Sequence, residues 1–523
     1  MTTVWDGLSR TGTSRTEPIA TELIATEPIA TELTLEVNRL AFNDVLEDLL
    51  KGVPDYTRFY TVDELDQRSE ALAAKYPDAV ELVELGASRK GTPIRSLRIG
   101  SGEKAALMFG CPHPNEPIGA MMLDYISGRL ASDADLRREL DYTWYIIKCI
   151  DPDGTRLNEG WFAGPFNIET YVRNFYRPPG YQQVEWTFPI HYKTLNFDRP
   201  LPETQCLIKI IDNERPRFMY SLHNAGFGGA YWYITGAVPK LHARFHELAK
   251  TRNIPLALGE PEVPYCEKFD DAVFGLFGVK DTYDYYKEHS GVEDPSTMIS
   301  GGSGSDEYAL TAAGTFSLVC ELPYYYDPRI EDMKPIDRSR RDSFLARLGE
   351  SEKHWNYVGE MLARIEPELS ISAKDSPFYD AISDNLKHIP ASIQAERNWA
   401  LSAREMERPA TGAEDFDNMV IARFYNMLSI GMLLRLVSGE LEAAGAGAAG
   451  GANSANGAND ANDANGAARY AVLEKARAEL DEAVARGCSE LEKALNYKVV
   501  PIADLVRIQL GSGMLLAKHL LGS

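Results

Sequence analysis

The chain has 523 residues, of which 44% are hydrophobic and 25% are charged, a composition typical of a globular protein with more than one core. Its 77 acidic and 54 basic residues give a net charge of −23, so nucleic acids and anionic membrane surfaces are poor partners. No apolar run reaches the ~18 uncharged residues of a membrane span, no secretory signal is predicted, and six scattered cysteines without a CxxC pair indicate reduced thiols in the cytoplasm.

Two low-complexity segments are expected to contribute nothing to a folded core. Residues 16–25 and 26–35 form a ten-residue tandem repeat without a large aromatic side chain, so we predict a disordered arm over residues 1–36. Residues 443–468 contain only Ala, Gly, Asn, Asp and one Ser, a composition typical of a flexible linker.

Between these segments, helical and strand patterns alternate. An acidic first turn and a helical apolar spacing predict a helix over residues 61–75, with Thr61 as its N-cap. A second helix is predicted at 118–130, and strands are predicted at 80–85, 94–99, 105–110, 143–150, 218–222 and 316–322. This alternation favours an α/β sheet covered on both faces, in a domain over residues 37–337.

The pattern changes after about residue 340. Residues 344–365 and 473–491 carry apolar side chains at spacings of three, four and seven, which are helical spacings. We therefore predict an all-helical region over residues 338–523, a bundle whose third and fourth helices are joined by the linker at 443–468.

His113 and Glu116 lie three residues apart, directly after the strand predicted at 105–110. At the start of a helix this spacing directs both side chains to one side, where they can hold one metal ion. Open α/β sheets carry their sites at the carboxyl ends of strands, which favours this interpretation. The alternative is an ordinary solvated pair on the surface.

His223 and Glu321 are two further candidates at the ends of predicted strands. His223 is either a metal ligand or a buried structural histidine. Glu321 interrupts an apolar strand, and a buried carboxylate there needs a partner or a metal-bound water, because an unpaired one is costly. Together with His113 and Glu116, these residues would make a catalytic zinc site with an open position.

The order of these pieces resembles the M14 zinc carboxypeptidases. The shared landmarks are HxxE at 113–116, DPDG at 151–154, a segment with two arginines, SLH at 221–223 and a glutamate in a late strand. In addition, residues 59–100 resemble the family's first helix and hairpin. The resemblance covers about residues 55–330 and implies a mixed-sheet carboxypeptidase-like domain. It implies one Zn²⁺ per chain, held by His113, Glu116 and His223, and Glu321 as the general base.

The resemblance also implies substrate-binding residues. An arginine should stabilise the oxyanion, and the segment YVRNFYRPP offers Arg177 and, less favoured by its spacing, Arg173. Arg199 matches the arginine that binds a terminal carboxylate. Asp306 aligns with the floor of the side-chain pocket, where it would favour a basic substrate group or would cap the following helix.

Three positions depart from the family pattern. Asp198 stands where the family normally has Asn, so it would pair with Arg199 or repel a substrate carboxylate. The arginine that usually lies between the first two metal ligands is absent, since Pro114 and Asn115 occupy that segment. A tyrosine is also missing about twenty residues before Glu321, where the chain reads Thr-Met-Ile.

The sequence therefore predicts a zinc metallocarboxypeptidase that hydrolyses a C-terminal peptide bond, with a peptide or an N-acyl amino acid as its substrate. One alternative is a small-molecule amidohydrolase or deacylase on the same scaffold, which Asp198 and the missing carboxylate-binding residues favour. The other is a catalytically inactive binding module, which the intact set of zinc ligands and Glu321 disfavours. The sequence predicts no oligomeric state.

Overall fold

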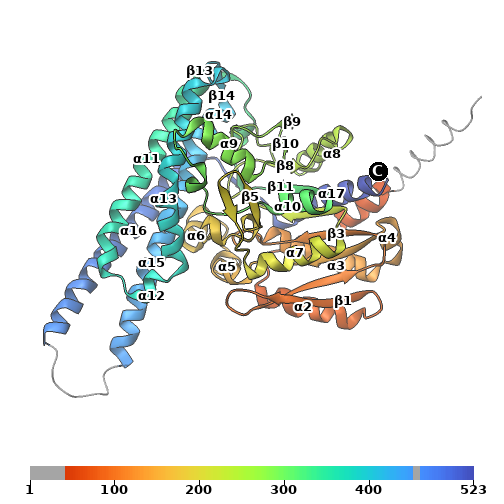
Figure 1. The fold of residues 1–523 in the computed structure, drawn as a ribbon, viewed down its shortest axis with the longest axis horizontal. Coiled ribbons are helices and arrows are strands. Elements are labelled where there is room, and N and C mark those ends of the chain that lie inside the picture. The colour runs from red at the N-terminus through yellow and green to blue at the C-terminus, as the bar shows by residue number, and fades with distance from the viewer. Residues whose placement is uncertain (1–41, 451–459, 523) are drawn as a thin grey trace, which may run out of the picture. The chain divides into compact units, whose positions relative to one another are not determined.

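The computed structural model describes residues 42–450 and 460–522 (Figure 1). The chain forms two units: Met1–Leu49, of which residues 42–49 are described and helical, and Leu50–Ser523, which contains every feature discussed below. The disordered arm predicted over residues 1–36 lies outside the described residues.

A nine-stranded mixed sheet forms the centre of the larger unit, with the order β1-β2-β4-β3-β7-β11-β8-β10-β9. The four adjacent strands β4, β3, β7 and β11 run parallel to one another. On either side of them, β2 pairs antiparallel with β4, and β8 pairs antiparallel with β11. The bounds are β1 Val80–Ala87, β2 Pro93–Ile99, β3 Lys104–Phe109, β4 Tyr142–Ile147, β7 Phe218–Leu222, β8 Tyr231–Ile234, β9 Lys268–Asp270, β10 Val273–Gly275 and β11 Phe316–Glu321.

Helices cover both faces of this sheet, which confirms the predicted fold class. They are α2 Val62–Lys75, α3 Ile118–Ser132, α4 Ala134–Glu139, α5 Pro152–Arg156, α6 Ile168–Asn174, α7 Pro202–Glu214, α8 Pro239–Lys250, α9 Val279–His289 and α10 Ser305–Ala313. The predicted cap of α2 is confirmed, because the Thr61 side chain accepts the Glu64 backbone N–H and Glu64 bonds back to Thr61.

Strand alternation sorts the sheet residues between the two faces. Leu107 and Met219 point into one core, where they pack with Leu207 and Ile211 of α7 and with Ala309 of α10. The other face carries large buried side chains such as Tyr220 and Trp232.

A helical bundle follows the sheet, as predicted. Its long helices are α11 Arg340–Ile365, α13 Pro377–Ser402, α15 Ala422–Gly450 and α16 Asp460–Ala494, with α12 Ile371–Lys374 and α14 Gly412–Phe416 between them and a π-helix at Asp417–Ile421. The chain is helical at 443–450 and 460–468, in contrast to the flexible linker predicted there. Alanine has the highest helix propensity, so the alanine-rich ends of that segment extend α15 and α16. The rest of the predicted linker, residues 451–459, lies outside the described residues.

The last helix, α17 (Ile502–Leu521), does not join the bundle although the sequence places it in the helical region. It packs against α3, α8, β7 and β11, on the second face of the sheet (Figure 1). Tyr220 donates a hydrogen bond to the Gln509 carbonyl at 3.1 Å, and the Trp232 indole N–H donates to the Ser512 hydroxyl at 2.9 Å. The sheet therefore obtains part of its cover from the far end of the chain.

Within residues 42–450 and 460–522, three short antiparallel strand pairs lie outside the main sheet. They are β5 Ile190–Tyr192 with β6 Leu195–Phe197, β12 Tyr325–Tyr326 with β15 Lys498–Val499, and β13 Pro335–Ser339 with β14 Pro409–Thr411. The last two pairs tie segments on either side of the predicted domain boundary at 337/338.

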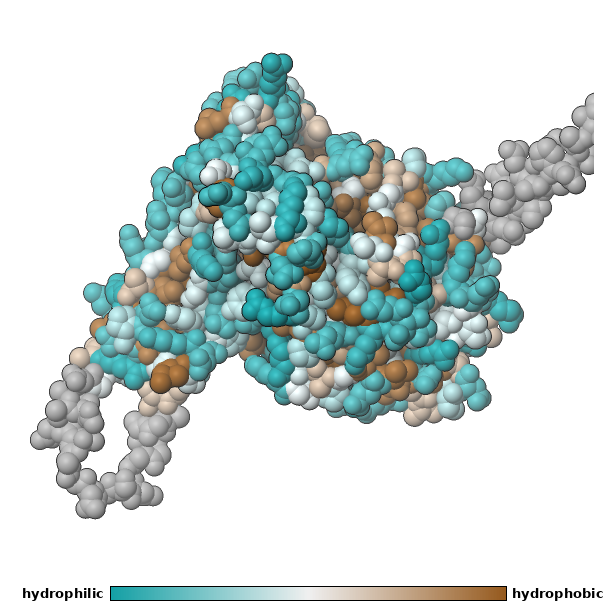
Figure 2. All heavy atoms as spheres, in the orientation of Figure 1, coloured by the Kyte–Doolittle hydropathy of each residue, from teal (hydrophilic) through white to brown (hydrophobic). Residues whose placement is uncertain are grey.

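One described helix, Gly412–Ala444, is long and apolar enough to cross a membrane by length and composition alone, although 67% of its most apolar window is buried inside the protein. Phe424 within it is fully buried and stacks on Tyr171, as expected for a core helix. On the face shown in Figure 2, hydrophilic side chains cover most of the surface and hydrophobic ones form small scattered patches.

Candidate metal centre

The turn between β3 and α3 carries the first two candidate ligands. Gly110 begins this turn against other backbone, and a Cβ there would lie 2.7 Å from the Lys148 carbonyl and 2.9 Å from the Ala120 nitrogen. The turn closes with a hydrogen bond from the Glu116 N–H to the His113 carbonyl at 3.1 Å. Both side chains are buried, and both Glu116 carboxylate oxygens lie 3.2 Å from His113 Nδ1.

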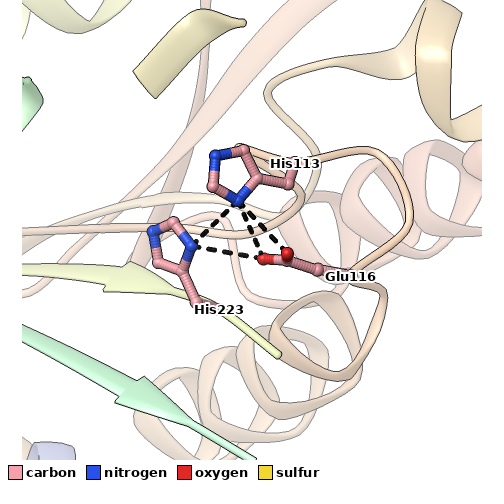
Figure 3. A group of neighbouring side chains, drawn as sticks. All are labelled: His113, Glu116 and His223. Atoms are coloured by element: carbon pink, nitrogen blue, oxygen red, sulfur yellow. Dashed lines mark hydrogen bonds and ion pairs between the residues drawn. The ribbon is translucent and has the colours of Figure 1, made fainter. Parts of the chain in front are cut away.

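His223 comes from the neighbouring parallel strand, directly after β7. Because β3 and β7 are adjacent and parallel, their carboxyl ends meet, which brings His223 to the turn after β3. Its Nδ1 lies 3.1 Å from His113 Nδ1 and 3.2 Å from a Glu116 oxygen (Figure 3). The structure thus brings together the three residues that the sequence predicts as metal ligands.

The chemistry of this donor set fits a zinc ion. Three ligands at ~2.1 Å from a tetrahedral centre are ~3.4 Å apart, close to the separations of these three groups. The carboxylates of Glu116, Glu185 and Glu321 overcome the effect of burial and raise the pKa of His223 to about 9. Burial and the charge of Arg177 lower the pKa of His113 to about 3, so its imidazole is neutral and free to act as a ligand at pH 7. The carboxylates therefore favour a positive charge at this point, which a metal ion would supply on displacing the second proton of His223 from Nδ1.

A hydrogen-bonded chain fixes which nitrogen of His223 faces the centre. The Ser221 hydroxyl donates to Glu185 at 3.0 Å, and its oxygen lies 2.8 Å from His223 Nε2. Since the single hydroxyl hydrogen goes to Glu185, Nε2 carries the histidine proton and Nδ1 keeps its lone pair for a metal. Ser305 also donates to Glu185, at 2.6 Å, and holds that carboxylate in place.

Glu321 ends β11, the strand next to β7. Its Oε1 lies 3.8 Å from His223 Nδ1, and its buried Oε2 has no hydrogen-bond partner among the described residues. Burial and the charge of Glu116 raise the pKa of Glu321 above its ordinary value. A carboxylate in such a position can accept a proton from a water molecule at the centre.

The structure distinguishes between the two arginines proposed for the oxyanion. Arg177 donates to Glu116 at 3.2 Å and lies 2.9 Å from His113 Nδ1, so its guanidinium group is at the centre. Arg173 instead pairs with Glu169 and Asp481 on the outer side of α6. The geometry therefore does not bring Arg173 to the metal ligands.

Within the described part of the chain, the residues predicted to bind a terminal carboxylate make no contact with the metal ligands, so their role stays a prediction. Arg199 and Asp198 are exposed after β6, and the one contact found for Arg199 places its guanidinium carbon 5.9 Å from the Phe197 ring. The resemblance placed Arg199 by the order of residues along the chain, but the β5–β6 hairpin directs this segment to solvent.

Asp306 lies in the first turn of α10, whose N-cap residue is Gly304, and the backbone N–H groups of Asp306 and Glu307 act on its carboxyl group. Burial and the nearby charge of Glu185 raise the pKa of Asp306 to about 7. Because Glu185 also approaches His223 Nε2, at 3.9 Å, Asp306 belongs to that side of the centre.

A family model described as "Zinc carboxypeptidase" (Peptidase M14) matches residues 65–342, more than half of the chain. The chain belongs to the M14 zinc carboxypeptidase family. Zinc carboxypeptidase A 1 of Anopheles gambiae is 28% identical over 109 residues, which are 20% of this chain and 25% of that protein. Carboxypeptidase B of Astacus astacus is 26% identical over 105 residues, or 19% of this chain and 35% of that protein. The chain thus matches about a quarter to a third of the length of these relatives.

Solved structures of carboxypeptidases are also similar to this M14 chain. Carboxypeptidase A from Helicoverpa armigera has 17% identity and a TM-score of 0.33, covering 72% of this chain and 82% of that one. A metallo-carboxypeptidase from Burkholderia cenocepacia has 17% identity and a TM-score of 0.32, covering 50% and 60%.

Several residues around the M14 centre were missed by sequence reasoning. Gln183 accepts from Arg177 Nε at 3.1 Å, and the Trp186 ring lies 5.6 Å from the Arg177 guanidinium carbon and 5.3 Å from the His113 ring. Gln509 of α17 donates to the His223 carbonyl at 2.8 Å. None of them belongs to a spaced motif, so only the fold reveals them.

Proposed function

We propose that the protein is a zinc-dependent metallocarboxypeptidase that hydrolyses the C-terminal amide bond of a peptide. The observation that carries this proposal is the arrangement of two buried imidazole nitrogens and one carboxylate around a single point, beside a carboxylate with an unpartnered oxygen. Peptide hydrolysis needs these two parts, a site for a Lewis acid and a base next to it.

Each side chain then has a defined task. A zinc ion held by His113, Glu116 and His223 would polarise the scissile carbonyl group and lower the pKa of a bound water. Glu321 accepts a proton from the attacking water at its carboxylate and returns it to the leaving nitrogen. Arg177 donates to the carbonyl oxygen as negative charge develops there.

A second candidate is a small-molecule amidohydrolase or deacylase that uses the same groups. The exposure of Arg199 favours it, because among the described residues only one arginine, Arg177, contacts the metal ligands. A substrate with a free terminal carboxylate usually requires a second fixed cation. We also propose a cytoplasmic location, which the six unpaired cysteines support.

The purified full-length protein tests this proposal. We expect about one zinc per chain by metal analysis and the release of C-terminal amino acids from a peptide library. Glu321→Gln should keep its zinc and lose hydrolysis, whereas Glu81→Gln, which changes an exposed carboxylate on β1, should behave as wild type. Folded, unchelated protein without zinc would refute the proposal, and cleavage restricted to N-acyl amino acids would favour the second candidate.

A further inference from the structure

One aromatic side chain of the helical bundle contacts the segment that follows the ligand His223. Tyr425, near the start of α15, donates a hydrogen bond from its hydroxyl to the Phe227 carbonyl at 3.1 Å. Phe227 follows the ligand His223 by only four residues. Tyr425 remains 43% exposed, so an anchored ring presents a face to solvent next to the segment that follows His223.

Close packing fixes α15 against the segment that follows His223. Phe424, the neighbour of Tyr425, is fully buried, and its ring centroid lies 5.9 Å from that of Tyr171 in a stacked arrangement. A Cβ at Gly226 would lie only 2.7 Å from the Phe424 ring. The ring of Tyr425 is therefore held by its hydroxyl at one end and by a packed backbone at the other.

The same helix holds the segment that leads to Arg177. The α15 backbone crosses α6 so closely that a Cβ at Gly431 would lie 2.1 Å from the Val172 carbonyl. Arg435 donates to the carbonyls of Asn174 and Phe175 at 2.8 and 3.0 Å, at the end of α6. Because α15 contacts the chain after His223 and the chain before Arg177, it is part of the frame of the centre.

Phe227 links Tyr425 to the chain after β11, because Phe227 also forms a bridge with Tyr325, four residues after Glu321. Glu321 pairs with Tyr231 in the sheet, and the Tyr231 hydroxyl donates to Glu262. Burial of its hydroxyl and the carboxylates of Glu321 and Glu262 raise the pKa of Tyr425. Tyr425 and Tyr231 thus provide aromatic surface beside Glu321.

Different residues lie near the two ring nitrogens of His223, so a substrate bound there would meet different groups on its two sides. Glu185 lies on its Nε2 side, at 3.9 Å, and is bonded by Ser305, the neighbour of Asp306, whereas Glu321 lies on its Nδ1 side, at 3.8 Å. If Asp306 receives the side chain of the residue that is released, the other half of the substrate, its acyl part, lies toward Glu321 and Tyr425.

We propose that Tyr425 is a specificity-determining residue that contacts the acyl part of the substrate, and that it favours an aromatic or planar apolar acyl group. A rigid tyrosine ring stacks on such groups at a low cost in side-chain entropy. The substrate site is then built by both the sheet domain and the helical bundle. This inference rests on the proposed amide hydrolysis and deepens it by naming a substrate class.

Two probes that differ only in the acyl group test this proposal: N-benzoylglycyl-lysine and N-acetylglycyl-lysine. We expect wild type to prefer the benzoyl probe in kcat/KM, Tyr425→Phe to keep most of this preference, and Tyr425→Ala to reduce it about tenfold. Tyr470→Ala, which removes a similarly exposed tyrosine from α16, is the matched control and should leave the preference unchanged. A preference in Tyr425→Ala within twofold of the wild-type value would overturn the proposal.

A binding measurement separates this proposal from the proposed reaction. In the zinc-loaded Glu321→Gln background, titration calorimetry should show the benzoyl probe binding about tenfold more weakly once Tyr425→Ala is added, with zinc content and Tm unchanged. Equal binding by the two proteins, or no binding by either, would refute the role of Tyr425. Tyrosine-dependent binding together with an inactive wild type would refute the hydrolysis alone.

Discussion

Arg177 has an unusual number of partners for one side chain. Its guanidinium group contacts Glu116, His113 and Gln183 and lies against the Trp186 ring, yet the side chain remains 30% exposed. A guanidinium group that is fixed on one side and open on the other can donate to a substrate oxygen without reorganising.

We expect Arg177→Ala to lower kcat by about 10²–10³-fold, because the donor to the developing negative charge is lost. Arg173→Ala, four residues earlier on the outer side of α6, is the matched control and should stay within about twofold of wild type. Steady-state kinetics on a library-selected peptide measures both variants. Equal losses in the two variants would contradict the assignment of Arg177.

Ser221 is small, but it sets the tautomer of His223. Ser221→Ala removes the acceptor for the Nε2 proton, so we expect zinc affinity to fall about 10–100-fold in competition with a chelating dye. Ser317→Ala on β11 removes a buried hydroxyl that has no partner among the described residues and should leave the affinity unchanged. An unchanged affinity in Ser221→Ala would show that another group fixes the ring.

The metal ligands could be predicted at this scale because each follows a strand in a short local pattern. HxxE after one strand and SLH ending another become neighbours as soon as the two strands pair. Trp186 and Gln183 have no such pattern, since they reach Arg177 only through the tertiary course of the chain. For Arg199, its position in the sequence does not reveal that its side chain is exposed after the β5–β6 hairpin.

Two glycines on α15 test whether this helix is part of the frame of the centre. We expect Gly431→Ala to destabilise the protein by at least ~2 kcal/mol and to lower activity, because its Cβ would overlap the Val172 carbonyl. Gly439→Ala on the same helix meets open space and should be neutral or stabilise by up to ~1 kcal/mol. Urea unfolding and kcat/KM compare the two. A functional, stable Gly431→Ala would refute the tight crossing of α15 and α6.

The π-helix before α15 introduces a pH dependence into stability. Asp417, its first residue, accepts the Glu260 backbone N–H at 2.9 Å, and burial together with the charge of Glu260 raises the pKa of Asp417 from 3.8 to about 7. Below pH 3.8 the carboxyl is protonated in both folded and unfolded chains. Between about pH 4 and 7 only the unfolded chain ionises, so stability falls as the pH rises.

Asp417→Asn removes this dependence while its amide oxygen can still accept the Glu260 N–H. We expect the variant to gain ~1 kcal/mol or more over wild type at pH 8 and nothing at pH 4, as measured by urea unfolding at both values. Asp375→Asn, at an exposed site, controls for the loss of one negative charge. A constant difference between Asp417→Asn and wild type across this range would contradict the raised pKa.

On the scale of the whole molecule, the division predicted at 337/338 is crossed repeatedly. The fold class and the order of most elements could be predicted, because the spacing of apolar residues indicates whether a segment is a helix or a strand and which of its faces is buried. Periodicity does not specify which other segment of the chain a helix or strand packs against. The apolar pattern of α17 suits a bundle helix as well as a sheet-covering one, and only packing against Tyr220 and Trp232 decides between them.

A chain that ends at Tyr497 would lose β15 and α17. Fifteen of the twenty α17 residues are buried, so we expect this truncation to expose one face of the sheet and to yield insoluble or unfolded protein. A chain that ends at Leu521 should behave as wild type. Circular dichroism and size-exclusion chromatography distinguish these outcomes, and a folded, active product ending at Tyr497 would refute the structural role of α17.

The bond from Gln509 to the His223 carbonyl spans 286 residues of sequence. During synthesis, His113, Glu116, His223 and Glu321 all leave the ribosome well before α17 does. A nascent chain therefore carries every reacting group for a long interval without the helix that supports them. The His223 carbonyl therefore obtains this support only after α17 has been made and has folded onto the sheet.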